Sequence, residues 1–345
     1  MNIDGREIGS HVSPYIVAEI SANHCGHLDH AKQLIRTAKW AGADAVKFQC
    51  YEPGEITLDC DNDDFRIKSG PWASQTLFEL YSKACTPREW FPDLFATARE
   101  CGISAFASVF SPAGVDYLES LGCPAYKIAS MELVDIPLIE HAAKTGKPII
   151  ISTGMGSMKE IRDALVAAES YMGVEALPLH CVSGYPTDID DADLGRLISI
   201  QNEMGDTGIS DHTLGWEVPV AAVALGAVMI EKHFILSRDL PSEDREFSLE
   251  PGEFKTMVDK VRQIWRAMQP PRHDAEADMK QFRRSIYAVA DIKAGESFTA
   301  ENVRSIRPGY GLPPSELPRL LNGGMANRDI PRGTALLRPG MVIYK

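Results

Sequence analysis

The sequence predicts an α/β protein, a (β/α)8 TIM barrel followed by a small β-rich domain. Eight short β-branched runs alternate with helical patterns, which is the repeat of such a barrel. No glycine-rich dinucleotide-binding turn follows the first run, so a doubly wound sheet is only the second choice. A polar, proline-rich stretch at 269–278 then separates a C-terminal region that is rich in turns.

Each of the eight runs has the length and composition of a buried strand. They cover residues 15–21, 43–49, 103–109, 124–130, 148–154, 177–183, 207–213 and 227–234. Helical patterns such as "LDHAKQLIRTAKWAGA" and "MKEIRDALVAAES" lie between them. A glycine often closes the helix before the next strand, because glycine adopts the left-handed conformation without steric penalty. These glycines are Gly42, Gly102, Gly122, Gly146 and Gly226.

The chain of 345 residues divides at a predicted linker. Residues 1–268 form the predicted barrel domain, 269–281 the linker and 282–345 the small domain. The small domain contains a faint repeat, "DIKAG" and "DIPRG", which indicates two similar halves. A unit of roughly 60 residues is marginal for independent stability, so we expect this domain to pack on another surface.

Composition narrows the class of function. The net charge of -13 argues against a nucleic-acid surface, although it does not exclude a small anionic substrate. No apolar run reaches the roughly 18 residues of a membrane helix, and no secretory signal is visible. Seven scattered cysteines without a C-x-x-C pair favour reduced thiols. We therefore expect a cytoplasmic protein that acts on a small molecule, with no nucleic-acid or membrane partner.

Polar residues stand at the C-terminal end of every predicted strand, where barrel enzymes place their active sites. Loop residues are usually polar, so part of this pattern is expected by chance. Lysines within "AVKFQ" and "AYKIAS" are not, because a buried ammonium group is unfavourable unless it is paired. The set is Glu19, Lys47, Gln49, Ser108, Lys127, Ser130, Glu132, Ser152, Thr153, Ser183, Asp211, His212, Glu231 and His233.

Two histidines form a candidate metal site. His212 and His233 end neighbouring strands, and two imidazoles so placed can bind one divalent metal. Asp211 and Glu231 are candidate partners that would orient the two rings. The alternative is a pair of hydrogen-bonded core histidines. Two nitrogen ligands do not choose between Mn, Mg, Zn and Co.

The two strand-end lysines indicate an anion site. Lys47 and Lys127, with the nearby serines, would surround a cavity with cations and hydroxyl groups, which suits a phosphate or a carboxylate. One alternative is that each lysine pairs with a glutamate, and another is a Schiff-base lysine. Glu19, Glu132 and Asp244 are candidate acid/base or hydroxyl-binding groups.

A set of segments, together and in this order, resembles the sialic acid (nonulosonic acid) synthase family. They are "AEISANH", "KFQ", "YKIASMEL", "STGM", "GISDHTLG", "IEKHF" and "FSLEP". The tail, "RRSIYAVADIKAGE" with "IRPGYG", resembles the antifreeze-like (SAF, β-clip) domain of that family. Within the family, "DFRIKSGPWASQTLFELYSKACTPREW" and "FSLEP" resemble the pseudaminic acid synthases.

The resemblance implies roles for individual residues. His212 and His233 match metal ligands, and they join Glu19 and Glu132 as catalytic residues. Ser183 stands where neuraminate-forming members have asparagine, Ser108 where many have threonine, and Asp244 lies in "PSED" where "GPD" is more usual. Positions that match sugar contacts are Gln49, Tyr185, Asp244 and Arg307. Positions that match phosphoenolpyruvate contacts are Lys47, Ser108, Lys127, Ser130, Ser152, Ser183 and Ser210.

The implied reaction condenses phosphoenolpyruvate with 2,4-diacetamido-2,4,6-trideoxy-L-altrose, giving pseudaminic acid and phosphate by carbon–oxygen cleavage, which makes the protein a transferase. The expected cofactor is a divalent metal, Mn²⁺, with Mg²⁺ or Co²⁺ as alternatives. Trp72 and Phe78 are candidates for an apolar surface beside the deoxygenated carbon of the sugar. Arg307 matches an arginine that the small domain extends into the partner subunit's site, which implies a domain-swapped homodimer.

Three other functions stay open at this point. The first is the same reaction on N-acetylmannosamine or a related sugar, as in N-acetylneuraminate or legionaminate synthases. The second is a lysine-imine aldolase on the same barrel. The third is a non-catalytic sugar-binding barrel.

Overall fold

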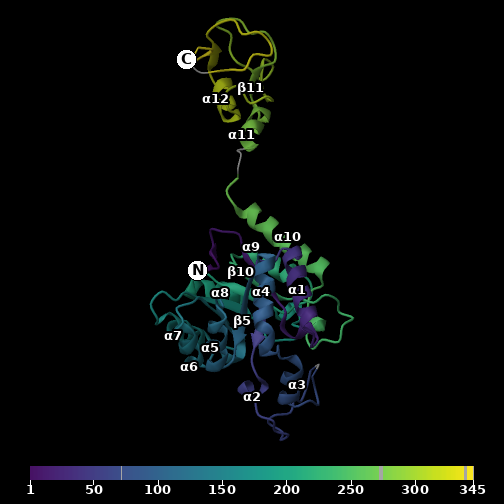
Figure 1. Ribbon diagram of the computed structural model, residues 1–345. Helices are drawn as coiled ribbons and strands as arrows, with labels where there is room; N and C mark the ends of the chain where they lie inside the picture. Colours follow the sequence, from purple (N-terminus) through teal and green to yellow (C-terminus); the bar gives the residue numbers. More distant parts are fainter. Residues whose placement is uncertain (71, 272–274, 338–339, 345) are drawn as a thin grey trace. The chain divides into compact units, whose positions relative to one another are not determined.

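The chain folds into two compact units, Met1–Gln269 and Pro270–Lys345, in a computed structural model. The structure describes residues 1–345 except 71, 272–274, 338–339 and 345. Figure 1 traces both units from the N-terminus in purple to the C-terminus in yellow.

Eight parallel strands of the first unit close into a barrel, which confirms the predicted fold class. Strands that follow one another along the chain are neighbours, and the last strand pairs with the first. Nearly all their residues are buried, because helices cover the outside while side chains fill the interior. The strands are β3 (Tyr15–Glu19), β4 (Ala45–Cys50), β5 (Ser104–Val109), β6 (Tyr126–Ile128), β7 (Ile149–Ser152), β8 (Ala176–Cys181), β9 (Gly208–Asp211) and β10 (Met229–His233).

Helices follow the barrel strands and surround them (Figure 1). Local sequence sets where they begin and end: Ser157 and Glu160 form a capping box at the start of α7, and Gly42 (φ 95°) ends α1. The other predicted helix-closing glycines also have positive φ angles. The helices are α1 (Leu28–Ala41), α4 (Phe91–Cys101), α5 (Pro112–Ser120), α6 (Ile136–Ala143), α7 (Met158–Glu169), α8 (Leu194–Met204), α9 (Glu217–Ala224) and α10 (Pro251–Met268).

The connection between β4 and α4 is longer than the others and carries two extra helices, α2 (Pro53–Ile56) and α3 (Leu77–Ala84). It is anchored at Glu55, whose carboxylate accepts hydrogen bonds from Arg88 Nη2 (2.7 Å) and Ser111 Oγ (2.8 Å). Because Ser111 lies two residues after the end of β5, this anchor holds the excursion beside the C-terminal ends of the strands.

β1 (Asn2–Ile3) and β2 (Arg6–Glu7) pair as a short antiparallel hairpin that adds Ile3 to the barrel core. All seven cysteines are unpaired thiols, as predicted. Within the described part of the chain, no helix combines the length and the apolar character needed to span a bilayer.

The second unit has its own apolar core around Ile286, Phe298 and Leu320. The two repeats face one another: Asp291 accepts a hydrogen bond from the Arg332 amide (2.8 Å), and Asp329 accepts one from the Ala294 amide (2.9 Å). This reciprocal pattern agrees with the two halves predicted from the sequence. Its elements are α11 (Ala275–Met279), β11 (Ser285–Ala288), β12 (Val303–Ile306), α12 (Leu317–Leu321), β13 (Gly324–Ala326) and β14 (Val342–Tyr344), and α11 falls within the predicted linker.

Candidate functional site

Four buried ionisable side chains meet at the C-terminal ends of the barrel strands. Lys47 Nζ lies 2.8 Å from Glu19 Oε2 and 3.3 Å from Glu231 Oε1. Lys127 Nζ lies 3.9 Å from the same Glu231 oxygen. None of the four residues is more than 4% exposed. Two ammonium groups therefore face two carboxyl groups, so the lysines pair with glutamates as one sequence alternative proposed.

The pKa values of the four groups in this cluster shift in different directions. Burial raises the pKa of Glu19 to about 7, although the positive charge of Lys47 acts to lower it. Burial also opposes ionisation of Glu231, but Lys127 and Lys47 hold the pKa of that carboxyl below its usual range. Burial lowers the pKa of Lys127, whereas Glu19 and Glu231 overcome burial and raise the pKa of Lys47. Glu19 is therefore the member of the cluster that exchanges a proton near neutral pH.

Serine hydroxyl groups contact these charges directly. Lys47 Nζ donates to Ser108 Oγ at 3.0 Å, and Lys127 Nζ donates to Ser152 Oγ at 2.5 Å. Ser210 Oγ donates to Glu231 Oε1 at 2.9 Å. Ammonium and hydroxyl donors thus lie together, as an anion site requires.

Two further predicted serines converge on Gly154, just after β7. The Gly154 amide donates to Ser130 Oγ at 3.2 Å. A Cβ atom at this position would lie 2.4 Å from Ser183 Oγ and 2.8 Å from Ser130 Oγ. Glycine is therefore required here for the close approach of the backbone to the two hydroxyl groups.

The two predicted metal-binding histidines lie side by side. The ring centroids of His212 and His233 are 5.4 Å apart. His212 Nδ1 lies 3.1 Å from the Val182 carbonyl oxygen, which can only accept, so Nδ1 carries a proton and Nε2 is the nitrogen that could bind a metal ion when it is unprotonated. His233 Nδ1 is buried, has no hydrogen-bond partner in the part of the chain that the structure describes, and lies 3.6 Å from Asp244 Oδ2.

These rings fit a divalent cation. Burial, followed by the nearby charge of His212, lowers the pKa of His233 well below its ordinary value, which favours the neutral ring that binds metals. Among the described residues, no group of three or more His, Cys, Asp or Glu side chains is arranged to hold a metal ion. A cation at this pair would therefore take its other ligands from substrate and water.

The expected orienting partners of the histidines were wrong. Asp211 pairs with Lys232, and Glu231 pairs with Lys47, so neither carboxylate holds an imidazole. The reason is the alternation of side chains along a strand. Glu231 and His233 share the inner face of β10, while Asp211 and Lys232 point to the outer face of the barrel wall.

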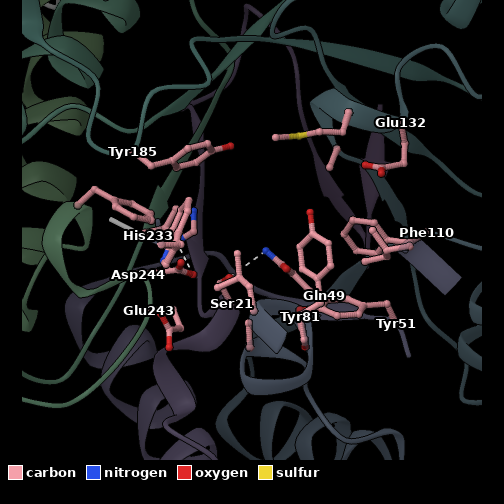
Figure 2. A pocket seen from close by; sticks show the side chains of 17 residues that line it. Ser21, Gln49, Tyr51, Tyr81, Phe110, Glu132, Tyr185, His233, Glu243 and Asp244 are labelled. Carbon is pink, nitrogen blue, oxygen red and sulfur yellow. Dashed lines mark hydrogen bonds and ion pairs between the residues drawn. The ribbon is translucent and has the colours of Figure 1, made fainter. Parts of the chain in front are cut away.

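A cavity of about 360 Å³ opens beside His233 (Figure 2). Figure 2 shows Tyr185, His233 and Asp244 on one side of it, and Phe110 and Glu132 on the other. Gln49 Nε2 donates to Ser21 Oγ (2.9 Å) and to Glu19 Oε1 (3.3 Å), which connects the cavity to the buried charges. The polar lining consists of Ser21, Gln49, Glu132, Tyr185, His233, Glu243 and Asp244.

Glu132 stands apart from the buried charges. Burial raises its pKa to about 7. Its Oε2 atom has no hydrogen-bond partner among the described residues. A carboxyl group of this kind can accept or give a proton at neutral pH.

The rest of the cavity wall is apolar or aromatic. Trp72 lines it as predicted, but Phe78 does not, because Leu80, Tyr81 and Ala84 form the face of α3 that meets the cavity. Most of this wall comes from the excursion between β4 and α4. Its members are Tyr51, Ile56, Trp72, Leu80, Tyr81, Ala84, Phe110, Ala129, Met131 and Phe247.

The structure brings all the predicted site residues to this end of the barrel except Arg307, which lies in the second unit. Sequence reasoning missed Ser21 and Tyr51. Each lies two residues beyond a predicted residue, Glu19 or Gln49, so the period of a strand could have found them. Tyr81 and Phe247 had no comparable pattern, because they reach the cavity from segments outside the strands.

Comparisons with known proteins agree over nearly the whole chain. The NeuB family matches residues 34–272 and the SAF domain matches residues 283–340. Pseudaminic acid synthase of Campylobacter jejuni is 44% identical over 326 residues, covering 93% of this chain and 95% of that protein. Pseudaminic acid synthase of Helicobacter pylori is 42% identical over 328 residues, covering 94% and 96%. The crystal structure of N-acetylneuraminic acid synthetase from Leptospira borgpetersenii, in complex with citrate, aligns with a TM-score of 0.72 at 30% identity, covering 81% of this chain and 95% of that one.

Proposed function

The chain belongs to the NeuB family, and from that premise we propose that it is a pseudaminic acid synthase. It condenses phosphoenolpyruvate with 2,4-diacetamido-2,4,6-trideoxy-L-altrose and releases phosphate, which makes it a transferase of the cytoplasm. The observation that carries this proposal is the similarity, over more than nine-tenths of the chain, to pseudaminic acid synthases of two organisms.

The apolar wall of the cavity supports this acceptor. The trideoxy sugar carries two acetamido methyl groups and a terminal methyl group, whereas N-acetylmannosamine has one acetamido group and a terminal hydroxyl. Ile56, Leu80 and Tyr81 offer such methyl groups an apolar contact. Gln49 and Asp244, among the polar residues of the lining, bind the hydroxyl groups.

Phosphoenolpyruvate binds at the anion site. Lys47 and Lys127 neutralise its phosphate and carboxylate, and the five serines donate hydrogen bonds to the same oxygens. Carbon 3 of the enol attacks the aldehyde carbon of the open-chain sugar, and water adds to carbon 2. The resulting tetrahedral species loses phosphate by cleavage of its carbon–oxygen bond. Glu19 and Glu132, each with a pKa of about 7, carry the protons that these steps require.

His212 and His233 would hold the divalent cation, Mn²⁺ with Mg²⁺ or Co²⁺ as alternatives, and the bound cation would supply electrophilic polarisation of the aldehyde oxygen. Val182 fixes the tautomer of His212 through its carbonyl group. Arg307 completes the sugar site of the partner subunit in a domain-swapped homodimer.

The test incubates metal-stripped enzyme with Mn²⁺, phosphoenolpyruvate and each candidate sugar, and it identifies products by mass spectrometry. We expect pseudaminic acid from the trideoxy-altrose, with the bridging oxygen of labelled phosphoenolpyruvate recovered in phosphate. His233→Ala should lose metal-dependent turnover, because one of two protein ligands is gone, while its circular dichroism stays that of the wild type. Turnover of N-acetylmannosamine alone would instead assign a neuraminate synthase, and binding of sugar without phosphate release would assign a non-catalytic barrel.

A further inference from the structure

An ion pair lies behind the barrel wall, directly beside the candidate metal site. Lys232 is 0% exposed and Asp211 is 4% exposed, and the two residues stand opposite one another in the register of β10 and β9. Their side chains form an ion pair. Both point away from the cavity, because their neighbours Ser210 and Glu231 point into it.

This pair is tied to the backbone on either side of His212. The Asp211 carboxylate accepts hydrogen bonds from the Thr213 amide (3.1 Å) and from Thr213 Oγ1 (2.9 Å). Lys232 Nζ also donates to the Thr213 carbonyl oxygen. The residues before and after His212 are thus held by one buried ammonium group on the adjacent strand.

Stability alone does not account for such a pair. Removing two charges from water is unfavourable, and apolar residues of similar volume often pack at least as well in their place. What apolar residues cannot supply is a set of directional contacts to the Thr213 amide and carbonyl. These contacts fix the backbone from which the His212 ring projects.

We propose that Lys232 is a positioning residue, which acts through Asp211 and Thr213 to hold His212 in the orientation that faces His233. The ring of His212 is then directed from two sides, by the Val182 carbonyl at Nδ1 and by its own anchored backbone. Lys232 itself touches neither substrate nor metal. The consequence for metal binding rests on the proposed function, whereas the consequence for backbone order does not.

The first test measures amide hydrogen exchange of the full-length protein by mass spectrometry. Lys232→Met should exchange at least tenfold faster in peptides that cover residues 207–216, while peptides from β4 to β7 keep their wild-type rates. Because Lys232→Met leaves Asp211 as an unpaired buried charge, the double variant Asp211→Asn/Lys232→Met is measured in parallel. The amide oxygen of its new side chain at position 211 can still accept from the Thr213 amide, while the contacts of the ammonium group with residue 211 and with the Thr213 carbonyl oxygen are lost.

Lys147→Met is the matched control. It makes the same chemical change and removes the ion pair of Lys147 with Glu119, away from the histidines. We expect wild-type exchange at 207–216 in this control. Equal acceleration across the whole barrel, or none at 207–216 in the folded double variant, would overturn the positioning role.

The second test titrates the same proteins with Mn²⁺ and follows the free ion by electron paramagnetic resonance. Residues that orient a metal-binding histidine typically change metal affinity by about 10- to 100-fold, so we expect the Kd for Mn²⁺ to rise by that factor in the double variant. A wild-type Kd in a variant with altered exchange at 207–216 would contradict the proposal. If the wild type itself binds no Mn²⁺, the metal part of the proposed function fails, and hydrogen exchange still decides the role of Lys232.

Discussion

Glu19 and Glu132 are carboxyl groups of the site whose pKa is raised by burial, and burial also raises the pKa of Asp244. The pKa of Glu19 and that of Glu132 reach about 7, so both change charge within the range in which enzymes of this kind operate. Neighbouring cations outweigh the effect of burial on the pKa of Glu231, but they do not outweigh it for Glu132. Two of the three acid/base candidates named from the sequence, Glu19 and Glu132, thus have a pKa of about 7, which suits proton exchange at neutral pH.

The raised pKa of Glu132 predicts a pH dependence of stability. The pKa is 4.5 for an ordinary glutamate and about 7 in the folded protein, so the folded state binds this proton more tightly. Glu132 therefore contributes its full stabilisation of the folded state below pH 4.5, and this contribution is lost as the pH rises through about 7. Replacement by glutamine should reduce the difference in free energy of unfolding between pH 5 and pH 8 by about 2 kcal/mol. Urea unfolding at the two pH values measures it, and an unchanged difference in Glu132→Gln would refute it.

Glu19 predicts a proton linked to binding of phosphoenolpyruvate. In the free site Lys47 is paired with Glu19, and protonation of that carboxyl releases the ammonium group for the incoming anion. We expect proton uptake at pH 8 when phosphoenolpyruvate binds, measured by calorimetry in two buffers of different ionisation enthalpy. Glu19→Gln should abolish this uptake, and Glu119→Gln, a surface control, should keep it. Equal uptake in Glu19→Gln and the wild type would assign the proton to another group.

The sequence predicted which residues lie at the C-terminal ends of the strands better than it predicted the partners of those residues. Lys47 and Lys127 could be identified because a lysine inside an apolar run is unfavourable unless its charge is paired. The pairing of Asp211 with Lys232 could not be predicted, because it depends on which face of each strand meets the cavity. The pKa values of Glu19 and Glu132 were also beyond sequence reasoning, since burial is a property of the assembled barrel.

The turn after β7 combines backbone and hydroxyl groups in one binding element. Ser130 and Ser183 come from neighbouring connections and meet at Gly154, where no side chain fits. The Gly154 amide contacts one of the hydroxyl groups directly. A single absent Cβ atom thus keeps space for two donors of the anion site.

Gly154→Ala should weaken the binding of phosphoenolpyruvate. The added methyl group displaces the Ser130 and Ser183 hydroxyl groups, so we expect the KM for phosphoenolpyruvate to rise about tenfold, or about 1.4 kcal/mol, with a smaller change for the sugar. Gly252→Ala is the control, because no atom lies within 4 Å of its added Cβ atom. Steady-state kinetics with each substrate varied in turn measures the effect. A KM for phosphoenolpyruvate that is unchanged in Gly154→Ala would remove this glycine from the binding element.

At the scale of elements, the eight strands were predictable because each is an apolar run that a glycine or a polar residue ends. Boundaries were less so: the run 124–130 forms a strand only over Tyr126–Ile128, since Ser130 already begins a turn. The excursion that carries α2 and α3 was not predicted. Its helices are short and bury few residues, so their apolar pattern is weak, and the inward face of α3 was misassigned to Phe78.

At the scale of the whole molecule, the chain consists of a large barrel unit and a small unit with a separate core. The internal repeat of the small unit was visible in the sequence, and paired aspartates join its two halves. The exposed Arg307 belongs to this unit, while every other predicted site residue belongs to the barrel. A role for Arg307 in the sugar site therefore requires that two units cooperate.

Complementation tests that cooperation. Arg307→Ala should impair use of the sugar, and so should His233→Ala, because each removes one part of the site. If the site is shared between subunits, a heterodimer of the two variants has one intact site, so equal mixing should restore about a quarter of wild-type activity. Tagged heterodimers isolated by tandem affinity chromatography provide the measurement. Inactive heterodimers would show that Arg307 serves no site on its partner.

The cavity draws its two kinds of surface from different parts of the chain. Residues at the strand ends, such as Gln49 and His233, provide polar lining, and one continuous stretch from Tyr51 to Ala84 provides much of the apolar wall. Under the proposed function, the residues that contact the acceptor sugar and those that carry out the reaction thus come from separate segments of the chain. Substitutions in that stretch alone could therefore change the sugar that a relative accepts. Exchanging the excursion between β4 and α4 is the shortest route to an enzyme that synthesises a different nine-carbon acid.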